Sequence, residues 1–289
     1  MFRHYQLPPE FAAAAADFNT GVKQPAQPRD AATVVLMRDG GQGPEVYLLR
    51  RQASMAFAGG VCVFPGGGVD PRDFDHEIAW SGPDPADWAS RLGVDEGHAR
   101  ALVCAAVRET FEESGVLLAG PSADEVVTDT TADDWEADRV ALESRDLAMT
   151  EFLDRRGLVL RSDLLGVWAG WLTPNFEPRR YRTWFFVADL PEGQRTRDVS
   201  SESSEVLWLP ALQAVEQAEA QQILMLPPTY MTCLDVGQHE NTHSVLTEAQ
   251  TRVVDMFTPQ VEQVDGSFRL SVPPYYEQLA QTREDQPRD

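Results

Sequence analysis

The sequence has little positive charge and almost no lysine. Among its 289 residues, 46 are Asp or Glu and 24 are Lys or Arg, and Lys23 is the single lysine. The formal net charge is therefore −22. A nucleic-acid-binding protein neutralises phosphates with a basic face, which this composition does not supply. We expect no nucleic-acid partner.

Cysteine and long apolar runs are also scarce. The three cysteines, Cys62, Cys104 and Cys233, lie far apart and form no C-x-x-C pair, so we expect buried free thiols rather than a zinc site or disulfides. The longest apolar stretches, such as 31–37 and 59–64, are far shorter than the roughly 20 residues that span a bilayer. No apolar segment of signal-peptide length occurs near the N-terminus. These absences predict a cytoplasmic protein without membrane contact.

The distribution of proline and charge suggests one main domain with two loose ends. Residues 1–29 read as an N-terminal arm, residues 30–275 as the domain, and residues 276–289 as a C-terminal tail. A turn-rich acidic stretch at 71–97 reads as an insertion on the surface. A dimer contact and a lid are both open roles for this insertion.

Short strands and helices alternate without a regular repeat. Apolar runs predict strands over residues 32–37, 46–49, 60–64, 167–172, 183–188 and 206–209. Periodic patterns predict helices over 98–114, 136–156 and 228–236, and a further helix that begins at Pro210. The pair Asp265-Gly266 predicts a hairpin turn. This order is typical of an α/β or α+β fold with a mixed or mostly antiparallel sheet.

The predicted helix over 98–114 concentrates acidic side chains on one face. At about 100° per residue, Glu109, Glu112 and Glu113 share an arc of roughly 100°. Like charges at this spacing and carboxylates in a last turn each cost a few tenths of a kcal/mol or more. A bound Mg²⁺ or Mn²⁺ would offset these penalties, because both ions favour carboxylate oxygen. The alternative is a solvated acidic face on an acidic protein.

Two segments around this helix resemble a known motif. Residues 108–116, Arg-Glu-Thr-Phe-Glu-Glu-Ser-Gly-Val, resemble the second half of the Nudix box, R-E-U-x-E-E-x-G-U, where U is aliphatic. Residues 64–67, Phe-Pro-Gly-Gly, resemble the strand end that opens the box. The stretch between these halves is longer than the usual G-x5-E-x7-R-E spacing. The first glutamate position falls on Asp73 counting forward or on Arg100 counting back, and neither residue is Glu.

An interrupted box with an extra helix resembles the peroxisomal-type coenzyme A diphosphatases and their bacterial relatives. Segments 171–174, 179–186 and 223–229 fit this branch. A coenzyme A signature of some relatives is matched only in part, because Gln52 and Ala56 replace its small residue and second arginine. The resemblance to this branch implies coenzyme A or acyl-coenzyme A as the leading candidate substrate. The alternatives are ADP-ribose, a dinucleotide or a nucleotide sugar, and a catalytically silent Nudix-like module that only binds a ligand.

The resemblance implies a fold and a chemistry. The Nudix fold is a mixed β-sheet sandwiched between helices, here with inserted loops and an extra helix. The implied reaction is hydrolysis of the pyrophosphate of a nucleoside diphosphate linked to another moiety, with Mg²⁺ or Mn²⁺ as cofactor. Glu109, Glu112 and Glu113 would be the metal ligands, and Arg108 would orient them through an ion pair. One of these glutamates, or Glu202 or Glu205 before the predicted strand at 206–209, would accept the proton of water.

Other residues are candidates for binding a small nucleotide-type substrate. Arg51, Arg180 and Arg182 are candidate phosphate contacts, because a guanidinium pairs with phosphate in a bidentate way. Gly66 and Gly67 lack a Cβ, so they allow a ligand or another backbone to come close. The proton acceptor, the number of metal ions and the oligomeric state, with a homodimer as one option, stay open.

Overall fold

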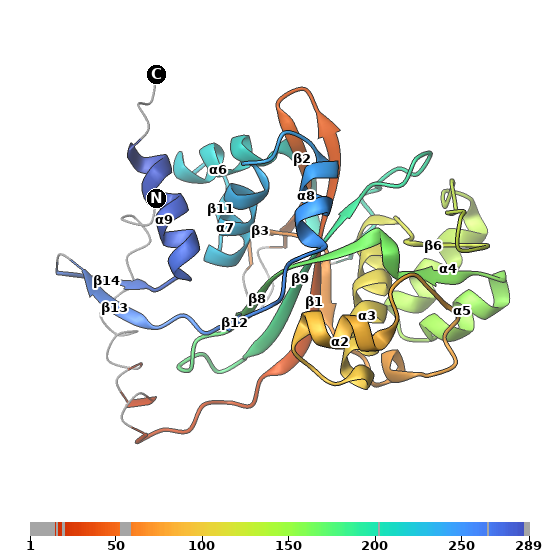
Figure 1. Cartoon of the computed structure of the whole chain (residues 1–289), viewed down its shortest axis with the longest axis horizontal. Helices are drawn as coiled ribbons and strands as arrows, with labels where there is room; N and C mark the ends of the chain where they lie inside the picture. Colours follow the sequence, from red (N-terminus) through yellow and green to blue (C-terminus); the bar gives the residue numbers. More distant parts are fainter. Residues whose placement is uncertain are drawn as a thin grey trace.

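The chain folds around one large mixed sheet (Figure 1). The computed structural model describes residues 15, 17–18, 21–52, 59–201, 203–264 and 266–285. The order along the sheet is β11-β3-β2-β1-β9-β8-β12, with β10 also paired to β2 and β4 to β1. The strands are β1 (Arg29–Gly40), β2 (Gly43–Arg51), β3 (Val61–Val63), β4 (Gly66–Gly68), β8 (Leu165–Leu172), β9 (Tyr181–Asp189), β10 (Ser203–Pro210), β11 (Leu224–Met225) and β12 (Met256–Phe257).

Strand β1 lies at the centre of this sheet. It pairs antiparallel with β2 and parallel with β9. Its side chains alternate between two apolar cores: Val34 and Leu36 belong to one, and Val35 and Met37 to the other. A strand that is buried on both faces reads as a continuous apolar run, as the sequence of β1 does.

Helices cover both faces of the sheet (Figure 1). Around the first core lie α2 (Pro85–Leu92), α3 (Glu96–Ser114), α4 (Asp133–Glu143) and α5 (Met149–Arg156). Around the second lie α6 (Ala211–Glu219), α7 (Pro227–Val236), α8 (Thr242–Ala249) and α9 (Pro274–Asp285). The predicted mixed sheet between helices is therefore confirmed. None of the described helices is both long and apolar enough to cross a membrane.

Smaller elements complete the fold. A three-stranded sheet has the order β5-β7-β6, and β13 pairs with β14 around Gly266, while Asp265 of the predicted turn lies outside the described residues. Their bounds are β5 (Trp80–Ser81), β6 (Ala119–Gly120), β7 (Val159–Arg161), β13 (Val261–Val264) and β14 (Ser267–Leu270). The short 3-10 helices are η2 (Pro71–Phe74) and η3 (Ser162–Leu164).

The single helix predicted over 136–156 is wrong. Two helices, α4 and α5, occupy this region, and the chain turns between them. The N–H groups of Asp146 and Leu147 both donate to the carbonyl of Ala141, and Arg145 has a φ of 65°. Leu147, which follows this turn, is buried in the core.

The stretch 71–97, predicted as a surface insertion, contributes to the core. It contains η2, β5 and α2, and α3 begins at Glu96 within it. The side chain of Trp88 on α2 is fully buried and contacts Phe186 of β9, with their ring centroids 5.9 Å apart. The acidic, turn-rich composition of this stretch reflects its exposed face and does not indicate that Trp88 is buried.

Most of the residues predicted as a C-terminal tail lie in α9. The ring of Tyr276 is buried and stacks on Trp171 of β8, with centroids 5.9 Å apart and planes 10° apart. Near the other end of α9, Arg283 forms an ion pair of 3.1 Å with Glu219 of α6. Both ends of the helix are therefore bound to the domain.

We expect Tyr276→Ala to lower the free energy of unfolding by about 3 kcal/mol, because it removes a buried aromatic ring and leaves a cavity. Urea denaturation measures this loss. Gln278→Ala on the exposed side of α9 is the matched control and should change stability by less than about 0.5 kcal/mol. Equal small effects of both variants would show that α9 is not held by this contact.

Candidate functional site

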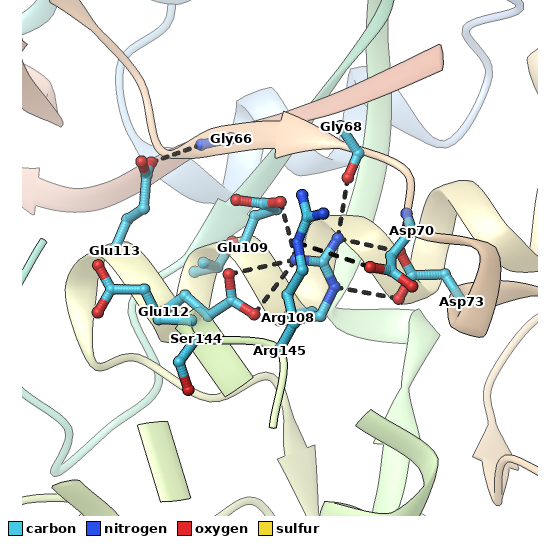
Figure 2. Close-up of polar contacts among 12 residues, drawn as sticks. Gly66, Gly68, Asp70, Asp73, Arg108, Glu109, Glu112, Glu113, Ser144 and Arg145 are labelled. Carbon is cyan, nitrogen blue, oxygen red and sulfur yellow. Dashed lines mark hydrogen bonds and ion pairs between the residues drawn. The ribbon is translucent and has the colours of Figure 1, made fainter. Parts of the chain in front are cut away.

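The site is built on α3, which presents an apolar side to the core and an acidic side to β4 and η2. The helix begins after Asp95, whose carboxylate accepts from the N–H of His98, and ends at Gly115 with φ 74°. Phe111 is fully buried and stacks on Phe152 of α5, with centroids 5.4 Å apart. This contact fixes the rotation of the helix, so Glu109, Glu112 and Glu113 face away from the aromatic cluster. Figure 2 shows these glutamates around Arg108 and β4.

Arg108 lies at the centre of the acidic side chains. Its side chain is 9 % exposed and forms ion pairs with Glu109 at 2.8 Å and Glu112 at 3.2 Å. Its Nη2 also donates to the carbonyl oxygen of Gly68 at 3.0 Å. Burial alone would lower the pKa of Arg108, but the charge of Glu109 and the bonds to Asp73 outweigh this effect and raise the pKa above its usual value. The guanidinium is therefore a fixed positive charge within the site.

Asp73 occupies the position that the spacing of the motif left open. Its carboxylate is 2 % exposed and takes two bonds from Arg108, at 3.0 Å from Nε and 2.9 Å from Nη2. Arg100, the other option, instead lies over the ring of Trp80. The sequence Asp70-Pro-Arg-Asp73 forms a capping box at η2, in which Asp70 N–H donates to Asp73 at 2.8 Å. The capping-box pattern is the signal in the sequence that favours Asp73.

Gly66 and Gly67 of β4 lie against two of the glutamates of α3. The N–H of Gly66 donates to Glu113 Oε2 at 2.8 Å. A Cβ on Gly67 would lie 2.6 Å from the carboxylate of Glu109. The absence of side chains here thus allows α3 to approach the strand, which is the backbone approach that the glycine run predicts.

Glu112 is buried, and its charge is only partly compensated by Arg108. Desolvation by burial and the negative charge of Glu109 raise the pKa of Glu112 to about 7, although Arg108 partly offsets both effects. Arg108 contacts three carboxylates, those of Asp73, Glu109 and Glu112, so negative charge outnumbers positive charge in this group. A cation next to Glu112 would remove this penalty.

The donor chemistry of the site fits a hard divalent cation. All three α3 side chains offer carboxylate oxygens, and the surplus negative charge favours a metal ion. Across the residues that the structure describes, no group of three His, Cys, Asp or Glu side chains is arranged to hold a metal. Glu109 and Glu112 instead contact Arg108, and Glu113 contacts Gly66.

The positive charge missing from the end of α3 comes from another helix. The last turn of α3 carries no basic residue, but Arg139 of α4 donates to the carbonyl oxygen of Glu112 at 2.7 Å. Arg139 is 3 % exposed and pairs with Glu136 at 2.7 Å and Glu143 at 3.0 Å. Glu143 in turn accepts from the N–H of Ser201 at 3.1 Å. Arg139 therefore offsets the helix dipole from outside the helix and connects α3 to the segment before β10.

Glu205 lies on the other face of the sheet from α3. Its carboxylate is 3.3 Å from Arg50, its partner on β2. Along β10, Val206 and Trp208 pack on the core under α3, whereas Leu207 and Leu209 pack on the core under α6 and α7. Alternation places Glu205 with the second pair. Glu202 lies outside the described residues.

Two of the arginines predicted to bind phosphate have other partners. Arg180 is 7 % exposed and donates to the carbonyls of Thr173 and Ala26, each at 3.0 Å. Arg182 pairs with Asp30 at 2.7 Å and lies over the ring of Trp184. In the contacts that the structure describes, neither arginine touches an α3 carboxylate.

Arg51 keeps a position that is compatible with the site. It is the last residue of β2, opposite Ser203 of β10. Leu49, two residues earlier, packs on the core under α3, so alternation places Arg51 on the same face as α3. Arg50, the preceding residue of β2, lies on the opposite face of the sheet with Glu205.

The sequence reasoning missed a carboxylate near the end of α3. The N–H of Arg197, next to Asp198, donates at 2.8 Å to the carbonyl oxygen of Ser114 at the end of α3, and burial together with the charges of Asp198 and Glu113 raises the pKa of Tyr47. The Tyr47 hydroxyl donates to the carbonyl of Arg197 at 3.0 Å, next to Asp198. No pattern in the sequence singles out Asp198 among the many acids of the chain.

Comparisons with known proteins agree with this architecture. A solved structure of a Nudix hydrolase from Alicyclobacillus acidocaldarius superimposes with a TM-score of 0.64 at 26 % identity, over 77 % of this chain and 96 % of that one. The central sheet and α3 thus form a Nudix fold. The family model of the NUDT19 Nudix domain matches residues 85–234, more than half of the chain. The chain belongs to this family of NUDT19 Nudix domains.

Curated relatives point to the same family. The acyl-coenzyme A diphosphatase NUDT19 of Gallus gallus is 27 % identical in an alignment 228 residues long that covers 64 % of this chain and 59 % of that protein. Its counterpart from Xenopus laevis is 26 % identical in an alignment 222 residues long that covers 64 % of this chain and 58 % of that protein. The chain thus spans less than two thirds of the length of these relatives. The family match contains α3 with Arg108 but not the glycines of β4.

Without metal, we expect Glu112→Gln to stabilise the fold at pH 8 by about 1–3 kcal/mol, because it removes a buried charge whose pKa is raised. Since the folded state binds the Glu112 proton more tightly, this charge costs nothing below about pH 4.5, and its cost grows up to about pH 7. Denaturation at several pH values measures the difference. Glu151→Gln on α5, half exposed, is the control and should change stability little. A difference that does not grow between pH 5 and 8 would contradict the raised pKa.

Gly67→Ala and Gly66→Ala should differ in their effects. The new Cβ of Gly67→Ala meets the end of the Glu109 side chain, which can move, so we expect a folded protein in which Glu109 is displaced and any metal-dependent turnover is weakened. In Gly66→Ala, the Cβ would lie 2.5 Å from the carbonyl oxygen of Ala32, so we expect a loss of stability of about 2 kcal/mol or more. Thermal unfolding and turnover rates measure both effects. Full activity of Gly67→Ala would show that the position of the Glu109 carboxylate is not needed for turnover.

Proposed function

We propose that this protein hydrolyses the pyrophosphate bond of coenzyme A or acyl-coenzyme A with the help of Mg²⁺ or Mn²⁺. Membership of the NUDT19 Nudix domain family supports the reaction type. The names of the two vertebrate relatives support the substrate. The observation that carries the proposal is the trio of α3 carboxylates around buried Arg108, which has the donors that a metal-dependent diphosphatase requires.

In this reaction, water attacks one phosphorus of the pyrophosphate and the bridging P–O bond breaks. The products are 3′,5′-ADP and 4′-phosphopantetheine, or its acylated form, and the proton of water passes to a base. A bound divalent cation supplies charge neutralisation for the pyrophosphate and activation of water. Glu109, Glu112 and Glu113 would hold the cation, and Arg108 would keep Glu109 and Glu112 in place through its ion pairs.

The proton acceptor is one of the α3 glutamates in this proposal. Glu205 was the other option, but its pairing with Arg50 on the opposite face of the sheet gives it no support. Arg51 and the backbone of β4 remain candidates for binding substrate from the α3 face. A cytoplasmic location and a homodimer also stay predictions.

A substrate panel with product identification tests this function. With Mn²⁺, we expect release of 3′,5′-ADP from coenzyme A and from an acyl-coenzyme A, at a higher kcat/KM than cleavage of ADP-ribose or a dinucleotide. Glu112→Gln should reduce turnover by about two orders of magnitude or more, and Glu151→Gln should retain it.

The other outcomes select the alternatives. Preferred cleavage of ADP-ribose or a nucleotide sugar would replace the proposed substrate. Binding of coenzyme A without any hydrolysis, with the three glutamates intact, would identify a silent binding module. Unchanged turnover of Glu112→Gln at saturating Mn²⁺ would remove Glu112 from the metal site.

A further inference from the structure

We propose that Arg145, in the turn between α4 and α5, binds the pyrophosphate of the substrate. This inference rests on the proposed function and adds a residue from a part of the chain that the motif does not include. Its side chain is 78 % exposed, and its guanidinium Nε lies 3.8 Å from Asp70 Oδ2. Figure 2 shows Arg145 beside the group formed by Asp70, Asp73 and Arg108.

The turn that carries Arg145 is bound to the site through its backbone. Arg72 donates from Nη1 to the carbonyl oxygen of Arg145 at 2.9 Å and to that of Leu147 at 3.4 Å. The same arginine bonds to Asp70 through Nε at 2.9 Å and Nη2 at 3.1 Å. Because Asp70 in turn donates to Asp73, the partner of Arg108, the turn has a defined position relative to α3.

The backbone at position 145 does not favour an arginine. Its φ of 65° lies in the left-handed region, where glycine and asparagine are accommodated more easily than a long side chain. The side chain gains only a loose, exposed ion pair with Asp70, which contributes little to stability. Folding therefore gives no reason for an arginine here, whereas binding an anion does.

The other arginines next to these carboxylates are engaged within the protein. Arg108 is 9 % exposed and bonds to Asp73, Glu109 and Glu112. Arg72 bonds to Asp70 and two carbonyls. Arg145 presents its guanidinium to solvent at the same place, and a guanidinium can bind two phosphate oxygens at once. An anionic substrate that approaches a protein of net charge −22 needs such a positive contact.

The test compares Arg145→Asn and Arg145→Lys with the wild type at saturating Mn²⁺, using coenzyme A and dephospho-coenzyme A. Asparagine suits the left-handed backbone, so we expect the melting temperature to stay equal or rise. The KM of Arg145→Asn should increase about tenfold for both substrates with kcat within about threefold, and lysine should restore part of the affinity. Arg155→Asn on α5, which removes another exposed arginine, is the matched control and should leave KM unchanged.

Three results would overturn the assignment. The first is an unchanged KM in Arg145→Asn. The second is an increase that is confined to coenzyme A, because it would place Arg145 on the 3′-phosphate that dephospho-coenzyme A lacks. The third is a loss of kcat and melting temperature without a change in KM, which would indicate a structural role.

A binding experiment separates this inference from the proposed function. Calorimetry with inorganic pyrophosphate and Mn²⁺ measures affinity without turnover. If the wild type hydrolyses none of the substrates, the proposed function fails, but weaker pyrophosphate binding by Arg145→Asn than by Arg155→Asn would still support the anion site. Equal pyrophosphate affinity of wild type and Arg145→Asn would overturn the inference whatever the activity.

Discussion

The buried guanidinium of Arg108 is the interaction on which the site depends. It joins three parts of the chain, because it bonds to Asp73 of η2, to the carbonyl of Gly68 at the end of β4, and to Glu109 and Glu112 of its own helix. Removing Arg108 would leave several buried carboxylates without a compensating charge, which is strongly destabilising. Arg108 therefore fixes both the position of α3 on the sheet and the direction of its carboxylates.

The site keeps more negative charge than folding alone would favour. Arg108 contacts three carboxylates, burial and the charge of Glu109 raise the pKa of Glu112, and the last turn of α3 carries no basic residue. Arg139 of α4 supplies a cation from outside the helix, through its bond to the carbonyl oxygen of Glu112. Such local conflicts with stability are expected where a protein binds a ligand that resolves them.

The sequence predicted the helix and its acidic side because both depend on local spacing. Gly115 ends α3 as expected, and the glycines of residues 66–67 allow the close approach of α3 to β4. The helix over 136–156 was predicted wrongly because its apolar spacing continues through the turn at Arg145, where bonds to Ala141 reverse the chain. For Arg180 and Arg182, the sequence did not show the partners that the structure gives them, the carbonyl of Thr173 and the carboxylate of Asp30.

By itself, the sequence determined the class of fold, the acidic side of α3 and the family resemblance, because each follows from residue type at short spacing. The tertiary structure decided which residue pairs with Arg108 across the interruption of the motif, where the sequence offered only the capping-box pattern at 70–73. Asp73 and Arg100 were equal by counting, and packing brings Asp73 to Arg108 while it places Arg100 over Trp80. It also decided that Arg139 and Arg145 lie beside α3 and that Glu205 does not. The physical reason is that such contacts join segments far apart in the chain, where the path of the backbone rather than local spacing sets their distance.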